Sequence, residues 1–150
     1  MIAMGKVEKL PPALEVAREF FRLAKSEGDG TFTAFKLQKL LYYAQAHSLH
    51  ERGRGLFNEK LKAWENGPVV PDIYHRTRGY RFIPDSHEDL GAPAGLSDAD
   101  RELVHAIWER YKHLTGDELS ELTHAGSPGR LRGSGRSGAQ RSILLTCGIR

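Results

Sequence analysis

The first apolar residues of the chain recur at helical spacing. Pro11 and Pro12 are tolerated at a helix start, and Gly28 is a natural left-handed stop. Glu15, Arg18, Glu19, Arg22 and Lys25 take one side of the intervening segment, and the apolar arc opposite them consists of Ala13, Val16, Ala17, Phe20, Phe21 and Ala24. The pattern predicts an amphipathic helix between Pro12 and Gly28.

A longer helix is predicted over residues 33–52, with Thr31 or Thr33 as its cap and Gly53 after its end. It has two apolar sides, one formed by Leu37, Leu40, Leu41 and Ala44 and the other by Phe35, Tyr42 and Leu49. Such a helix is central and packed by neighbours on both sides. Its remaining face is expected to reach water or a partner, and carries Lys36, Lys39, Tyr43, His47 and His50.

The next stretch is dominated by glycine and proline. Leu61 and Ala63 alternate with lysines, but a single strand has no evident partner, so residues 53–67 are interpreted as an extended loop. Gly67 and Val70 precede prolines and are expected to be extended. Pro71 begins a short helix through Arg78, and residues 80–96 form a long irregular connection.

Two capping boxes follow. Ser97 with Asp100 predicts a helix to about Leu114, and Thr115 with Glu118 predicts a shorter one that ends near Gly126. In the latter, Leu119 and Leu122 are expected to point inward. The predicted fold class is therefore all-α: a compact single-domain bundle of about five helices around residues 33–52.

Composition separates a tail from this body. Of the 17 residues from 126 to 142, 14 are Gly, Ser, Arg or Pro, so this segment is expected to be poorly ordered. Residues 1–125 hold 17 Lys and Arg against 19 Asp and Glu, whereas residues 126–150 hold five Arg and no acid. The basicity lies in the tail, and the nearly neutral body lacks the broad cationic face of a nucleic-acid binder.

The remaining features of the sequence indicate the cellular compartment. The 150 residues suit one domain and contain no run of about 18 apolar residues, so we expect no membrane partner. The lone Cys147 suits a reducing compartment. The expected location is the cytoplasm.

No residue set predicts catalysis, a metal or a cofactor. His47 and His50 lie on one helix turn, but Lys36 and Lys39 share that face and no third ligand is evident; His124 fits a helix-end cap. The carboxylates of Glu65, Asp72 and Glu118 are ordinary surface charge. There is no Gly-rich phosphate loop and no nucleophile elbow, so the chain is predicted not to be an enzyme.

Aromatic residues are the more informative class. Core packing is expected for Tyr42 and Trp64, whereas Tyr43 and Tyr80 lie where aromatic side chains anchor protein partners.

Three ordered motifs carry a resemblance. They are Lys36 to Ala46 (KLQKLLYYAQA), Ala63 to Tyr74 (AWENGPVVPDIY) and Leu119 to His124 (LSELTH), with Leu56-Phe57 between the first two. Over roughly residues 10–128 the chain resembles the Panacea-domain family, which includes SocA-like antitoxins and phage-associated GepA-like proteins. We assign residues 1–128 to this domain and residues 129–150 to the tail.

The resemblance implies an antitoxin of a bacterial or prophage toxin–antitoxin pair, which neutralises a cognate protein toxin by direct contact. One branch of the family delivers its toxin to a housekeeping protease, so a proteolytic adaptor role stays open. The expected partner surface is Lys36, Lys39, Tyr43, His47 and Tyr80, where charge reversal of Lys39 with truncation of Tyr43 should leave the melting temperature unchanged. The expected scaffold consists of Leu37, Gln38, Leu40, Tyr42, Trp64, Gly67, Pro68, Val69, Pro71, Tyr74, Thr123 and His124.

The chain departs from the family after Pro128. The family usually continues with Ser-Pro-Trp and a further helical stretch, whereas Gly129 and the Arg-rich run follow here. We hypothesise a change of reading frame near Pro128. Translation of the other two frames tests this, because one of them should encode a Trp-led helical continuation.

A rival interpretation is a nucleic-acid-associated regulator that uses the basic tail as a phosphate tether. Salt-dependent DNA binding that is lost on deletion of residues 126–150 would favour it. Growth arrest by a neighbouring open reading frame, relieved by this chain, would favour the antitoxin.

Overall fold

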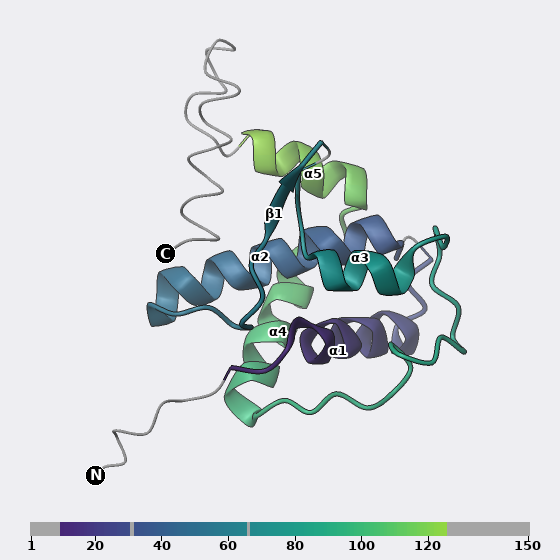
Figure 1. Ribbon diagram of the computed structural model, residues 1–150, viewed down its shortest axis with the longest axis horizontal. Helices are drawn as coiled ribbons and strands as arrows, with labels where there is room; N and C mark the ends of the chain where they lie inside the picture. The colour runs from purple at the N-terminus through teal and green to yellow at the C-terminus, as the bar shows by residue number, and fades with distance from the viewer. Residues whose placement is uncertain (1–9, 31, 66, 126–150) are drawn as a thin grey trace.

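The computed structural model describes residues 10–30, 32–65 and 67–125. Within them, five helices and one small hairpin form the fold, which confirms the predicted, mainly helical bundle (Figure 1). Helix α2 (Ala34–Arg52) lies at the centre and contacts all four other helices and strand β2. Its buried residues join those of α1 and α4 in one hydrophobic core.

The ends of α1 and α2 follow the predicted signals. Helix α1 (Ala13–Ser26) begins directly after Pro12, and its first N–H is bonded to the distant Glu59 carboxylate at 2.8 Å. Thr33, not Thr31, caps α2 by accepting the N–H of Lys36 at 3.0 Å. Gly53 ends α2 in the left-handed conformation at φ 77°, which glycine adopts without steric cost.

The segment expected to be an extended loop contains a hairpin, so that expectation is wrong. Strand β1 (Lys62–Trp64) pairs antiparallel with β2 (Gly67–Val69), and Ala63 lies opposite Pro68. The partner strand was overlooked because a Gly-Pro-Val sequence has low strand propensity by itself. It is held in place by α2, against which β2 packs.

The last three helices close the bundle. Helix α3 (Pro71–Thr77) starts at the predicted proline, and α4 (Asp98–Tyr111) starts after Ser97, which accepts the N–H of Asp100. Helix α4 ends at Tyr111, earlier than the predicted Leu114.

Helix α5 (Gly116–Ala125) confirms the second capping box: Thr115 Oγ1 accepts the N–H of Glu118, whose carboxylate accepts the N–H of Thr115. Leu119 is buried as expected, but Leu122 is 41% exposed. The helix rests on α2 along the face that carries Gly116 and Leu119, so Leu122 lies beyond the contact.

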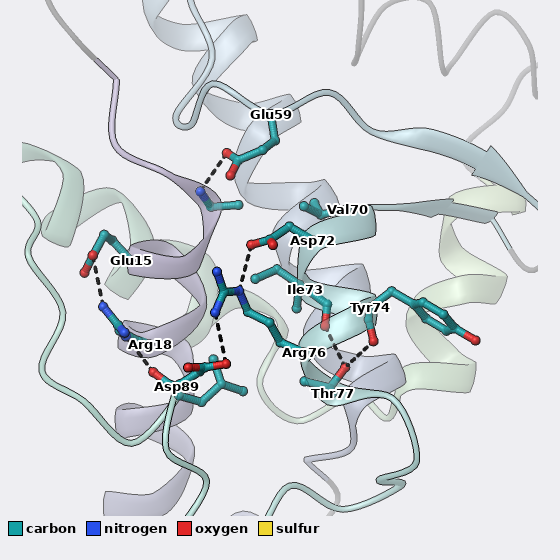
Figure 2. Close-up of polar contacts among 12 residues, drawn as sticks. Glu15, Arg18, Glu59, Val70, Asp72, Ile73, Tyr74, Arg76, Thr77 and Asp89 are labelled. Atoms are coloured by element: carbon teal, nitrogen blue, oxygen red, sulfur yellow. Dashed lines mark hydrogen bonds and ion pairs between the residues drawn. The ribbon is translucent and has the colours of Figure 1, made fainter.

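The connection from α3 to α4 is irregular, as predicted, and is tied down by ion pairs. Arg76 bonds Asp72 on its own helix at 2.9 Å and Asp89 in the connection at 2.9 Å (Figure 2). His87 bonds the carbonyl of Arg76 through Nε2, while its Nδ1 accepts the N–H groups of Asp89 and Leu90. These contacts hold the chain that leads away from Tyr80.

The expected poor order of the tail and the expected scaffold role of Thr123 and His124 both concern parts that the structure does not describe. The tail from residue 126 onward lies outside the described residues, as do the side chains of Thr123 and His124.

Among the described helices, none combines the length and the apolar character needed to cross a membrane.

Candidate functional site

The face of α2 that was predicted to meet a partner is largely buried, so the predicted exposure is wrong. Lys36 is 0%, Lys39 1% and Tyr43 9% exposed, and His47 is partly buried. The reason is that α4, α5 and the hairpin cover the third side of α2 as well as its two apolar sides. Charge reversal of Lys39 with truncation of Tyr43 is therefore expected to destabilise the fold.

Lys36 joins three parts of the chain. Its Nζ donates to Asp29 Oδ2 at 2.9 Å and to the carbonyl oxygen of Lys112 at 2.6 Å, and lies 5.5 Å from the ring centre of Trp108. A buried ammonium is stable only when paired and hydrogen-bonded in this way. Lys36 thus fastens the ends of α1 and α4 to the start of α2.

Lys39 lies beneath the hairpin. Its Nζ is 4.8 Å from the ring centre of Phe35, and burial lowers the pKa of this ammonium to about 8. A side chain at Gly67 would place its Cβ 2.7 Å from the same Nζ. Gly67, at φ 109°, is therefore required both by its backbone conformation and by the lysine below it.

Tyr43 and His47 belong to an aromatic cluster between α2, α4 and α5. The Tyr43 ring stacks on Tyr111 at 4.5 Å, and its hydroxyl donates to the carbonyl of Leu119 at 3.0 Å. His47 Nε2 lies 3.1 Å from the Tyr111 hydroxyl. Burial, together with the charge of Arg110, lowers the pKa of His47. These groups hold helices together and offer no open binding surface.

Two glutamines on α2 clamp the neighbouring backbone. Gln38 Oε1 accepts the N–H of Val70 at 2.8 Å and its Nε2 donates to the Val70 carbonyl at 3.1 Å. Seven positions later, Gln45 bonds the N–H groups of Leu56 and Phe57 and the carbonyl of Phe57. Gln38 is one of the scaffold residues expected from sequence, whereas Gln45 was not expected to have a role, although its seven-residue spacing from Gln38 places the two on the same side of the helix.

A buried carboxylate, also overlooked, supports α1 against α4. Glu19 is 0% exposed, although helical spacing placed it on the polar side. It accepts bonds from Arg22 at 2.7 Å, Arg101 at 2.8 Å and His105 at 2.6 Å. Burial by itself raises the pKa of Glu19. The hydrogen bonds from Arg22 and His105, together with the positive charges of Arg22 and Arg101, outweigh that effect and lower the pKa to about 2.

The exposed aromatic residues lie elsewhere, at the edges of the hairpin, α3 and the following connection. We define the aromatic patch as the side chains that are 40%, 39%, 47% and 54% exposed: Trp64, Tyr74, Tyr80 and Phe82. The Trp64 ring meets Tyr74 edge-on at 4.9 Å. Figure 2 shows Tyr74 pointing away from the ion pairs of Arg76. The expectation that Trp64 is a core residue is wrong, because the hairpin places it outside the core.

Two surface hollows join this patch. One, of about 640 Å³, lies between the start of α2, the chain at Tyr80 to Phe82, and the start of α5. The other, of about 560 Å³, lies between α2, α3 and the hairpin, and is lined by Trp64 and Tyr74. Phe35 and Tyr80 line both hollows, so the patch is continuous. Of the predicted partner residues, only Tyr80 belongs to it.

The residues considered from sequence for metal or acid–base chemistry are not brought together in the described part of the chain. No group of three His, Cys, Asp or Glu in that part of the chain could hold a metal ion. The three carboxylates considered from sequence are separated: Asp72 pairs with Arg76, Glu118 caps α5, and Glu65 is exposed beside the hairpin turn.

Comparison with known proteins identifies the family. Residues 37–128 match the family described as Antitoxin SocA-like, Panacea domain, and the chain therefore belongs to it. The match ends at residue 128, directly before the Arg-rich tail assigned from sequence to residues 129–150. The chain is 50% identical to Antitoxin SocA of Caulobacter vibrioides (strain NA1000 / CB15N) over 38 residues, which are 25% of this chain. That segment spans about a fifth (20%) of the SocA protein. No solved structure matches the chain.

Proposed function

We propose that this chain is an antitoxin that neutralises a protein toxin by direct contact, and that the aromatic patch is the contact surface. Membership of the SocA-like family supports the role. The choice of the aromatic patch as the contact surface rests on one observation: its exposed side chains form a continuous surface around two hollows.

The physical case rests on what these side chains gain on binding. Trp and Tyr each remove a large apolar area from water and lose little rotamer entropy, and they dominate the binding energy of protein interfaces. Arg81, 5.6 Å from the Phe82 ring, adds a cation at the rim. The buried lysines and the Tyr43 cluster keep the elements that carry the patch in fixed positions.

The test begins with co-expression. A neighbouring open reading frame that arrests growth alone, and does not arrest it together with this chain, identifies the toxin. Calorimetric titration then compares the intact chain with the Tyr80→Ala/Phe82→Ala variant. We expect the variant to weaken binding by about 2–4 kcal/mol, which is roughly 30- to 1000-fold in Kd.

A matched control keeps this test specific. Glu102 is exposed on α4, away from the patch, so Glu102→Ala should bind toxin as the intact chain does. Equal toxin affinity of the folded double variant and the control would contradict the aromatic patch as the interface. Absence of any neighbouring toxin would contradict the antitoxin role itself.

Proteolytic delivery is distinguished from simple occlusion by the lifetime of the toxin. If the chain is an adaptor for a housekeeping protease, the toxin half-life in growing cells shortens when the chain is present. If it acts by occlusion alone, the complex accumulates and the toxin half-life is unchanged or longer.

A further inference from the structure

Strand β1 presents a free edge at the rim of the aromatic patch. All three of its residues are exposed, and in the described part of the chain their backbone groups bond only to β2. Strand β2, by contrast, is half-buried to buried and packs against α2. An unpaired strand edge is a template for a strand of another polypeptide.

The register shows which backbone groups are available. Ala63 lies opposite Pro68, which has no N–H, so these two residues cannot form a hydrogen-bonded pair. In an antiparallel ladder such pairs alternate, and the residue of a non-bonded pair directs its N–H and C=O away from the partner strand. Both backbone groups of Ala63 therefore point to the open edge.

The side chains along this edge indicate the chemistry of the partner. Lys62 and Trp64 are both exposed and share one face of the strand, and the exposed Lys60 lies two positions before the strand begins. Across a strand pair, opposite charges attract and like charges repel. A partner strand that carries a carboxylate opposite Lys62 is therefore favoured, whereas a second copy of β1 would bring a second Lys62 ammonium to the same small sheet.

From this geometry we propose that the partner toxin docks by adding an extended acidic segment to the edge of β1, with its backbone bonded to Ala63. This deepens the proposed function and rests on it. Trp64 belongs both to this edge and to the aromatic patch, so a bound segment continues directly into that surface.

The test uses a change that alters the edge alone. Ala63→Pro removes the outward N–H, and because position 63 is a non-bonded position it leaves the β1–β2 hydrogen bonds in place. Ala63→Val is the matched control, since it keeps the N–H and suits a strand. With the toxin identified by co-expression, we expect Ala63→Pro to raise Kd by about tenfold or more and Ala63→Val to leave it within about twofold.

Charge-reversal variants and amide hydrogen exchange give two further tests of the proposal. Lys62→Glu should weaken toxin binding and reverse its salt dependence, whereas Lys25→Glu, on the exposed surface of α1, should not. Binding should also slow hydrogen exchange at the Ala63 amide. Equal Kd values for the Pro and Val variants, with an Ala63 amide that exchanges as fast in the complex as in the free chain, would overturn the proposal.

The two hypotheses fail in different ways. If the intact chain neutralises no toxin, the proposed function fails and this inference with it. If the chain neutralises a toxin and Ala63→Pro neutralises it equally well, only the edge pairing is wrong. Sedimentation that shows a dimer of the chain, abolished by Ala63→Pro, would mean that the edge pairs with a second copy and would also overturn it.

Discussion

Gln38 and Val70, 32 positions apart, are joined by two hydrogen bonds between the side-chain amide of one and the backbone of the other. Val70 is fully buried and lies between β2 and α3. The glutamine thus satisfies two backbone groups at the point where the hairpin passes into the helix. Because Trp64 and Tyr74 lie on either side of this point, the clamp positions half of the aromatic patch.

Substitution of Gln38 by leucine should therefore destabilise the fold. The buried N–H of Val70 would lose its partner, at a cost of about 1–3 kcal/mol, whereas the Val70 carbonyl would keep the bond from the Tyr74 N–H at 3.0 Å. We expect the free energy of unfolding, measured by urea titration, to fall by about 1–3 kcal/mol. Lys60→Ala, at an exposed position, should change it by less than about 0.5 kcal/mol. An equal effect of the two substitutions would contradict the clamp.

Glu19 should make the protein acid-sensitive. Its pKa is about 2 in the folded state against 4.5 for an unperturbed glutamate, so it contributes stability that is present above pH 4.5 and lost as the pH falls toward 2. The shift corresponds to roughly 3 kcal/mol. We expect Glu19→Gln to lower stability by about this amount at pH 7, and the difference from the intact protein to vanish near pH 2.

Chemical denaturation at a series of pH values measures this difference. Glu102→Gln is the control, because Glu102 is an exposed residue of α4 and its substitution should leave the loss of stability at low pH unchanged. A Glu19→Gln variant with the same pH profile as the intact protein would show that the buried carboxylate is not the acid-sensitive group.

Lys39 should have the opposite pH signature. Burial lowers its pKa to about 8 from 10.5, so the unfolded chain binds more protons than the folded one between these values. Stability linked to Lys39 therefore rises as the pH increases from 8 to 10.5, by up to roughly 3 kcal/mol. Lys39→Met, which removes the titrating group and keeps most of the volume, should abolish this part of the rise. The measurement is the difference in unfolding free energy between the two proteins across that pH range, and a constant difference would refute the assignment.

Gly116 lies at a close contact between α5 and α2. A Cβ at this position would lie 2.7 Å from Phe35 Cδ2 and 3.0 Å from the backbone nitrogen of Lys36. We expect Gly116→Ala to lower the melting temperature by several degrees, as overpacking typically costs about 1–3 kcal/mol. Gly30→Ala, where a Cβ meets nothing within 4 Å, is the matched control and should leave the melting temperature nearly unchanged.

Most helix boundaries, and above all the helix starts, were predictable because the groups that set them are local. Thr33, Ser97 and Thr115 each bond a backbone N–H three positions away, and Gly53 bonds the carbonyl four positions back. Contacts at this range are readable from spacing alone. The same holds for the family motifs, whose order along the chain was sufficient to indicate the SocA-like Panacea family.

The candidate site was predictable only in part. Tyr80 was named from sequence as an exposed partner residue and is exposed, whereas Trp64 was assigned to the core and is not. Phe82 is only two positions from Tyr80, whereas Trp64 and Tyr74 are brought to it by the hairpin and α3, which meet the connection only in the folded chain.

What the sequence determined by itself, then, is the helical class, most of the helix limits and the family. The class and the limits follow from periodicity and from hydrogen bonds between near neighbours, and the family follows from the resemblance of three motifs. The tertiary structure decided which polar residues are buried and which aromatic residues are exposed. Lys36 meets its carbonyl partner 76 positions away, and a pattern that scores lysine as polar places it at the surface. Burial of a charge is favourable only where distant groups converge to pair with it, and that convergence is a property of the fold.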